Sequence, residues 1–194
     1  GFDSNDTSEV IVTGWYPNPC YEWSHATLDK KQDGVGISLK ALVKQGLDTV
    51  CIAMAVPYLQ SVKLGALPEG KTKLFVGSQE SAIRISRANS NSVDDHIYAQ
   101  VTHVRVEDRK MLVIEAENPS DCVVLDHIES VYNGKDTCSV LPIMKQIKEV
   151  CDRNSQVSEY KFPIPKECLQ AERVLFHVRS LEGKSMNFLL KQQR

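Results

Sequence analysis

The chain lacks the features that mark membrane-spanning and nucleic-acid-binding proteins. No apolar run among its 194 residues approaches the 18 or more residues needed to cross a bilayer. Lys and Arg number 23 and Asp and Glu number 25, so the formal net charge is −2 and no basic excess is available to bind phosphate backbones. We therefore expect no transmembrane segment and no nucleic-acid partner.

The signatures of familiar enzymes and cofactor sites are also missing. The chain has no Gly-x-Ser-x-Gly phrase, no Cys-x-x-Cys pair and no glycine loop with phosphate-binding spacing. Five histidines could act as general bases, but each is more typical of a solvated strand face: His25, His96, His103, His127 and His177. We expect a non-enzymatic protein with no cofactor and no metal. A hydrolase with an unrecognised site is the alternative.

The two halves of the chain share landmarks at a nearly constant offset. Two Pro-x-x-Cys phrases end at Cys20 and Cys122, 102 residues apart, and two Val-Cys pairs end at Cys51 and Cys151, 100 residues apart. A histidine, a leucine and a Leu-Phe strand core recur in the same order. This order indicates two copies of one unit, rather than a chance likeness of apolar phrases. We place the copies at 1–88 and 97–194, joined by a polar Ser- and Asn-rich linker at 89–96.

Short segments rich in β-branched and aromatic residues predict strands in both copies. In the first copy they are 9–13, 21–26, 36–42, 50–56, 61–64, 72–76 and 82–86. In the second copy they are 97–106, 111–116, 123–131, 137–143, 158–164, 173–179 and 187–190. About seven short strands per copy are typical of an immunoglobulin-like β-sandwich, so the predicted fold is all-β with two tandem sandwich domains. The helical spacing of Met144, Ile147 and Val150 predicts one short helix at 144–151.

The six cysteines suit disulfides better than other chemistry. If each copy folds separately, Cys20 pairs with Cys51 and the repeat predicts the rest. The predicted bonds are Cys20–Cys51, Cys122–Cys151 and Cys138–Cys168. Free buried thiols and metal binding are the alternatives. A zinc site built on Cys20 and His25 is disfavoured, because five strand positions span roughly 16 Å and zinc ligands must converge on one ion.

The densest chemical feature is the aromatic segment at residues 15–23, which holds both tryptophans. Its candidate binding residues are Trp15, Tyr16, Tyr21 and Trp23. Tryptophan and tyrosine are favoured anchors at interfaces, and the second copy lacks them, so the fold does not require them. The alternative is that they pack the sandwich end around the disulfide. Strand alternation also places Glu22 on the same face as Cys20, which predicts a bulged or edge strand.

The first copy resembles small secreted bacterial domains with an immunoglobulin-like sandwich. The resemblance rests on Pro-x-x-Cys at 17–20, on Val50-Cys51, on the Leu-Gly-x-Leu-x-x-Gly turn at 64–70 and on the closing strand at 74–77. It covers about 60 residues of the first copy and the second copy only loosely. The second copy lacks the Leu-Gly turn and has two more cysteines. Such domains are often exported or lipid-anchored, so the resemblance implies a location and a fold but no reaction.

These features together predict an exported binding or structural module. We expect it to be secreted, periplasmic or on the outer cell surface, because disulfides persist in oxidising environments. The residues from Gly1 onward open on a polar segment without signal-peptide features, and a lipid anchor could lie on a cysteine upstream of Gly1. The expected ligand is a protein or a glycan. The leading alternative is a protease inhibitor that presents residues 15–23 as its loop.

Overall fold

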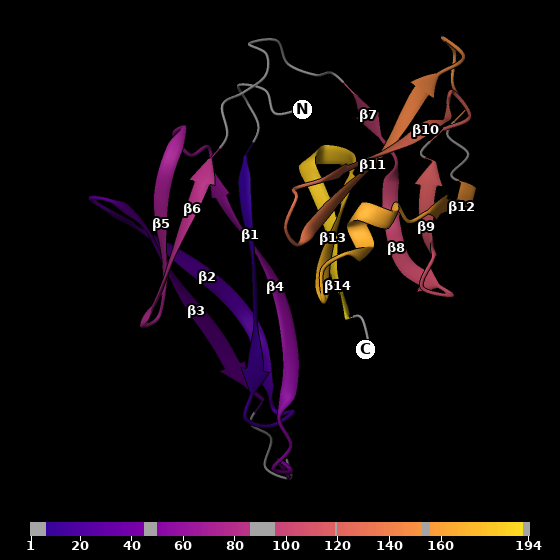
Figure 1. Ribbon diagram of the computed structural model, residues 1–194. Helices are drawn as coiled ribbons and strands as arrows, with labels where there is room; N and C mark the ends of the chain where they lie inside the picture. Colours follow the sequence, from indigo (N-terminus) through magenta and orange to yellow (C-terminus); the bar gives the residue numbers. More distant parts are fainter. Residues whose placement is uncertain (1–6, 45–49, 86–95, 119, 153–155, 192–194) are drawn as a thin grey trace. The chain divides into compact units, whose positions relative to one another are not determined.

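The computed structural model describes residues 7–44, 50–85, 96–118, 120–152 and 156–191 (Figure 1). By its internal contacts the chain divides into two compact units, Gly1–Asp94 and Asp95–Arg194. The predicted linker at 89–96 lies outside the described residues except for His96. Among the described residues, the structure contains no apolar helix of the length required to cross a bilayer.

Unit 1 is built from two sheets. Its strands are β1 (Ser8–Tyr16), β2 (Tyr21–Lys31), β3 (Gly34–Val43), β4 (Val56–Gly65), β5 (Gly70–Val76) and β6 (Gln79–Ile85). Strands β1 and β4 form one antiparallel sheet, and the other four follow the order β2-β3-β5-β6. The β3–β5 ladder is parallel, because the chain crosses to the other sheet through β4 before it returns.

Unit 2 repeats this pairing and adds to it. Its strands are β7 (Ile97–Tyr98), β8 (Gln100–Glu107), β9 (Met111–Asn118), β10 (Val123–Tyr132), β11 (Thr137–Gln146), β12 (Gln156–Pro163), β13 (Arg173–Ser180) and β14 (Lys184–Lys191). One sheet has the order β12-β9-β8, and the other has the order β10-β11-β13-β14 with the short β7 on β11. The β11–β13 ladder is parallel, like β3–β5. Strands β9 to β14 therefore correspond to β1 to β6, and β8 is an additional strand.

The predicted fold class, an all-β chain of sandwich architecture with disulfides, is confirmed. The bonds are Cys20–Cys51, Cys122–Cys151 and Cys138–Cys168, the same three pairs that the repeat predicts. The only helical segments among the described residues are two short 3₁₀ turns, η1 (Lys166–Leu169) and η2 (Leu181–Gly183). The parallel ladders were not predicted.

The edge strands carry irregularities at equivalent places. Strand β2 is an edge strand with a register shift between Trp23 and His25, as the position of Glu22 predicted. Strand β10 is also an edge strand, and its register shifts between Leu125 and His127, at the same offset of 102.

The two cores differ in size. In the described part of unit 1 the buried apolar side chains are Cys20, Val35, Ile37, Val62 and Leu74. Unit 2 has a larger core whose buried members are Ala99, Val101, Leu112, Ile114, Ala116, Cys138, Val140, Met144, Ile164, Cys168, Val174, Phe176 and Val178. Phe176 also stacks on Phe188, with 5.1 Å between ring centroids.

The structure differs from three sequence predictions of local structure. The helix at 144–151 is absent, because β11 continues to Gln146 in its ladder with β10, and Ile147 and Val150 are exposed rather than packed on one face. The predicted strand at 50–56 is also absent, since β4 begins only at Val56, opposite Tyr16. The predicted strand at 97–106 is divided into β7 and β8 by Ala99, whose N–H donates to the Pro142 carbonyl.

Candidate binding surface

Four strand ends meet at one end of unit 1. Tyr16 at the end of β1 faces Val56 at the start of β4, and Tyr21 at the start of β2 faces Val43 at the end of β3. The Cys20–Cys51 disulfide joins the β1–β2 turn to the segment that leads into β4, with 5.8 Å between the Cα atoms. This covalent bond fixes the backbone at an end where the sheets no longer supply hydrogen-bond ladders.

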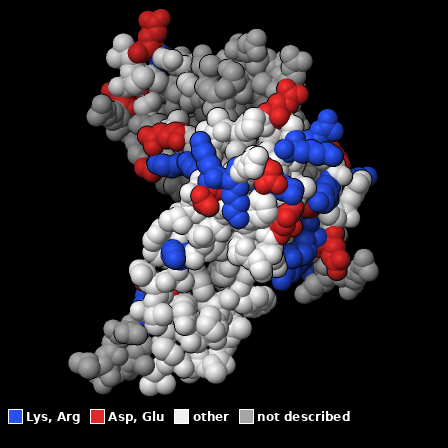
Figure 2. Space-filling view, turned by 90° about the vertical axis from the view of Figure 1, so that its left-hand side faces the viewer, with Lys and Arg blue, Asp and Glu red and all other residues white. Residues whose placement is uncertain are grey.

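Large apolar side chains are exposed around this disulfide. We call the group the apolar end, and its members, with the exposed fraction of each, are Trp15 (64%), Leu42 (54%), Val43 (42%), Val50 (85%), Ile52 (55%) and Met54 (53%). In Figure 2 the lower end of the molecule, where β3 ends and β4 begins in Figure 1, carries few charged side chains. A cluster of this kind on a soluble domain is typical of an interaction site.

Tyrosine rings pack on the inner side of the same strands. The ring of Tyr16 lies 4.7 Å from that of Tyr58 and 6.4 Å from that of Tyr21. The Tyr58 side chain lies against Gly14 of β1, since a Cβ added to Gly14 would lie 2.5 Å from the Tyr58 hydroxyl oxygen. The Tyr16 hydroxyl is buried without a hydrogen-bond partner among the described residues, and this burial raises the pKa of Tyr16. Because side chains alternate along β1, inward packing of Tyr16 turns Trp15 outward.

The four aromatic residues singled out in the sequence therefore have different environments. Trp15 is strongly exposed, whereas Tyr16, Tyr21 and Trp23 are half-buried. The tyrosines pack the sandwich end, whereas Trp15 faces outward, so a binding role for the aromatic segment stays a prediction. The sequence prediction missed the other members of the apolar end. Val50, Ile52 and Met54 lie in the apolar run at 50–56, which the sequence predicts to be a strand.

The corresponding end of unit 2 carries more polar groups, although Ile147 and Val150 are also exposed there. Glu117 and Asn118 occupy the positions equivalent to Trp15 and Tyr16. Asp121 accepts hydrogen bonds from the Lys148 Nζ at 2.6 Å and from the backbone N–H of Asp152 at 2.9 Å. The bond to Lys148, more than that to Asp152, holds the pKa of Asp121 below its usual value. The equivalent ends therefore differ in part: both expose a valine beside the disulfide, but unit 2 adds the Lys148–Asp121 ion pair and has Glu117 where unit 1 has Trp15.

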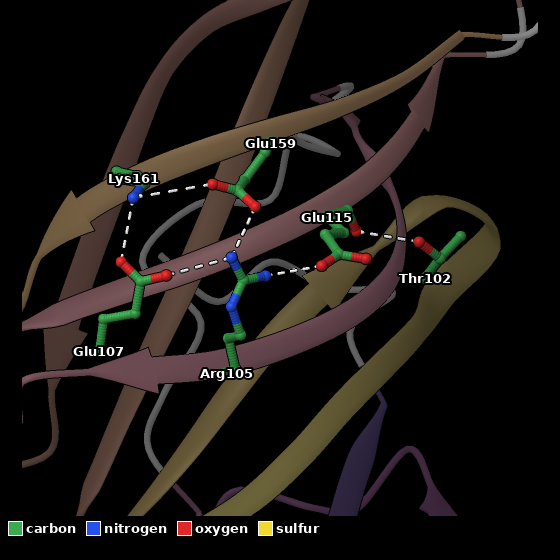
Figure 3. Close-up of polar contacts among 6 residues, drawn as sticks. All are labelled: Thr102, Arg105, Glu107, Glu115, Glu159 and Lys161. Atoms are coloured by element: carbon green, nitrogen blue, oxygen red, sulfur yellow. Dashed lines mark hydrogen bonds and ion pairs between the residues drawn. The ribbon is translucent and has the colours of Figure 1, made fainter.

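A network of charged side chains covers the outer face of the β12-β9-β8 sheet in unit 2 (Figure 3). The Arg105 guanidinium donates to Glu115 and Glu159, each at 2.6 Å, and lies 3.1 Å from Glu107. Lys161 donates to Glu107 at 3.0 Å, and this bond, followed by that from Arg105, lowers the pKa of Glu107.

Val113 is fully buried on the central strand of this sheet, paired with Arg105 on one side and Lys161 on the other. Since Val113 is not part of the inner core cluster, the aliphatic stems of these cations account for its burial on the outer face. The network thus covers the outer face of the sheet, and its two cations are shared among three carboxylates.

The histidines and cysteines do not combine into a reactive centre. His127 follows the β10 bulge, with Nδ1 2.7 Å from an Asp126 carboxylate oxygen and Nε2 3.1 Å from a Glu129 carboxylate oxygen. These two bonds, Asp126 first, raise the pKa of His127. Cys20 and Cys122, which precede His25 and His127 by five residues, are held in disulfides and cannot supply thiolates. Within the described ranges no group of His, Cys, Asp and Glu is arranged to hold a metal ion.

Unit 2 also has an open depression of about 510 Å³ between β8 and the β13–β14 connection. Its lining includes Val101 and Ser180, and the Ser180 hydroxyl accepts a hydrogen bond from the Val101 N–H at 2.9 Å. This buried hydroxyl therefore serves the structure, and the titratable groups of the lining, Glu182 and Lys184, form an exposed ion pair of 2.9 Å with each other.

Comparison with known proteins finds a family model that is similar to the first unit. Residues 10–85 match the model of the family described as the ORF11 beta-sandwich domain. The match runs from β1 to the last residue of β6, so it includes all six strands of unit 1 and the strand ends that form the apolar end. No curated protein and no solved structure is significantly similar to the chain.

Proposed function

We propose that the chain is a non-enzymatic binding module that recognises another protein through the apolar end of unit 1. The observation that carries this proposal is the exposure of Trp15, Val50, Ile52 and Met54 around one disulfide. A monomer has no stability gain from exposing these groups, whereas burying them against a partner releases the free energy of removing apolar surface from water.

The chemistry of this surface favours a protein partner. Trp and Met are enriched in interface cores, where they fill apolar pockets of the partner. Lys44 and Glu22 form a salt bridge of 2.7 Å beside this end, which gives the surface a polar rim. An apolar centre with a charged border is the usual anatomy of a protein interface.

Paired surface variants of the full chain test the proposal. Trp15→Ser combined with Met54→Ser removes two exposed side chains from the apolar end and leaves the Cys20–Cys51 bond in place. Val131→Ser combined with Val157→Ser removes two exposed apolar side chains from unit 2 and is the matched control, since these residues are 54% and 72% exposed.

The readout is capture of partners from native extracts of the source, identified by mass spectrometry, followed by affinity measurement with the purified partner. We expect the first variant to weaken binding at least about tenfold, as is typical for hot-spot residues, and the control to bind like the wild type. Equal retention of every partner by the wild type and both variants would refute the role of the apolar end.

We further propose that the protein works outside the reducing cytoplasm, as a secreted, periplasmic or cell-surface module. Three disulfides support an oxidising compartment. The protease-inhibitor alternative has weaker structural support. Only residues 17–20 separate β1 from β2, and Cys20 within this turn is buried, so the segment is not a protruding extended loop.

A further inference from the structure

The sheet formed by β1 and β4 is incomplete when unit 1 is compared with unit 2. In unit 2 the central strand β9 pairs with β12 on one side and with β8 on the other. In unit 1 the equivalent strand β1 pairs only with β4 among the described residues. A two-stranded sheet is marginal by itself, whereas a third strand adds a full ladder of hydrogen bonds.

The edge of β1 that has no partner strand in the described part of the chain also lacks the devices that usually prevent strands from pairing with other chains. Strands β2 and β10 carry bulges in addition to charged side chains, and β12 ends at Pro163. From Val10 to Tyr16, β1 contains no charged residue, no proline and no register shift. An unprotected strand of this length is suited to pairing.

Strand β8 shows which kind of strand fits this position. On β9, the residues Leu112, Val113 and Ile114 face Val106, Arg105 and Val104 of β8. A strand in the position of β8 thus supplies two valines to the inner face of the sheet, and the residue between them lies on the outer face. The equivalent residues of β1 are Val10, Ile11 and Val12, so β1 itself has this Val-x-Val pattern.

We propose that two copies of the chain associate through antiparallel pairing of their β1 strands. In the register that β8 uses on β9, Val10 of each copy faces Val12 of the other, and Ile11 faces its own counterpart on the two-fold axis. The product is a continuous four-stranded sheet of order β4-β1-β1-β4. The contact is isologous and closes on itself, so it gives a dimer and not a fibre. This inference does not depend on the proposed function.

A charge placed at Ile11 tests the pairing. Sedimentation equilibrium of the full chain over a wide concentration range gives the dimer dissociation constant. In Ile11→Lys two lysines would face each other across the axis, and we expect dimerisation to weaken at least about tenfold. Mixing Ile11→Lys with Ile11→Glu should restore association, because the facing charges are then opposite. Thr13→Lys is the control on the same outer face, since residue 13 would face Glu9 of the second copy.

Cysteine cross-linking gives a second test that does not depend on affinity. Ile11→Cys should form a disulfide-linked dimer on mild oxidation, because directly facing residues have Cβ atoms about 4.5–5.5 Å apart. Thr13→Cys should not, since each residue 13 lies four positions from its counterpart in this register. Peptide mapping under non-reducing conditions distinguishes this bond from exchange with the native disulfides.

Three results would overturn the proposal. One is a chain that remains monomeric at every concentration. Another is a dimer that Ile11→Lys leaves unchanged, because it must then form through another surface. The third is a monomer that instead binds a synthetic peptide of the β8 sequence, Gln100–Glu107, which would assign the edge to a foreign strand.

Discussion

Single residues set the closest contacts in each sandwich, and Gly34 is the clearest case. It faces Lys73 at the start of the parallel β3–β5 ladder. A Cβ added to Gly34 would lie 2.1 Å from the Lys73 carbonyl oxygen, which belongs to the backbone and cannot rotate away. The absence of a side chain is therefore required for these strands to approach.

We expect Gly34→Ala to lower the free energy of unfolding of unit 1 by about 1–3 kcal/mol, the usual cost of forced overpacking. Gly36→Ala on the same strand is the control, because the nearest atom to its added Cβ is the flexible Lys31 Cε at 3.2 Å. The free energy of unfolding of Gly36→Ala should stay within about 1 kcal/mol of the wild-type value. Urea unfolding followed by tryptophan fluorescence measures both. Equal stability of the two variants would mean that the ladder tolerates the methyl group.

Some residue contacts could be predicted from the sequence and others could not. The pairs Cys20–Cys51 and Cys122–Cys151 follow from the repeat, because a nearly constant offset makes these cysteines equivalent, and Cys138 and Cys168 are then left for each other. The exposure of Met54 does not follow, since an alternating apolar pattern is the same whether its face meets a core or solvent. The burial of Val113 could not be predicted either, because it depends on which strands become neighbours in the sheet. A local sequence pattern does not specify those neighbours.

At the scale of elements, the outer face of the β12-β9-β8 sheet is held by charges rather than by apolar packing. Arg105 is shared among three carboxylates, and Lys161 pairs with two of them, Glu107 and Glu159. Without Arg105, these carboxylates would repel one another and Val113 would lose part of its cover.

We expect Arg105→Gln to lower the thermal midpoint of unit 2 at neutral pH. The difference from the wild type should shrink at high salt, which screens exposed charges. Because the pKa of Glu107 is lowered in the fold, the stability it contributes is present above its ordinary pKa of 4.5 and is lost as the pH falls through the lowered value. The difference between variant and wild type should therefore also shrink in acid.

Calorimetry at several pH values and salt concentrations measures these effects. Arg105→Lys is the control, since it keeps the charge but not the planar fork that binds several carboxylates at once. The thermal midpoint of Arg105→Lys should lie between those of the wild type and Arg105→Gln. A midpoint that Arg105→Gln leaves unchanged would show that the network adds no stability.

Most strands could be predicted from turn residues and β-branched runs, whereas the connections between them could not. Met144, Ile147 and Val150 have helical spacing, yet the pairing of β11 with β10 extends through Met144 to Gln146. Tertiary pairing overrides this local pattern. Similarly, the parallel β3–β5 ladder requires β4 to cross between sheets, and strand order across two sheets leaves no mark on the residues of β3 or β5.

At the scale of the whole molecule, the two copies of one fold differ in how much they bury. In the described residues, unit 1 has few fully buried apolar side chains and one disulfide, whereas unit 2 has a larger core and two disulfides. Apolar burial and cross-links both raise stability, so unit 2 should be the more stable.

We expect unit 1 to unfold at lower urea concentration than unit 2. Trp15 and Trp23 are the only tryptophans of the chain and both lie in unit 1, so tryptophan fluorescence follows unit 1 alone. Circular dichroism in the far ultraviolet follows both units. The fluorescence transition should have its midpoint at a lower urea concentration than the later part of the dichroism transition, which reports unit 2. Coincident transitions would contradict the prediction.

The parallel ladders also have a consequence for how the chain reaches its fold. Each ladder joins segments about 40 residues apart, with a strand of the other sheet between them, so it can close only late in folding. During that delay β5 and β13, which share a Leu-Phe core, could each enter the ladder of the wrong copy. The Cys20–Cys51 and Cys122–Cys151 bonds enclose β3 and β11 within their own units, and their early formation would bias each copy against exchanging strands with the other.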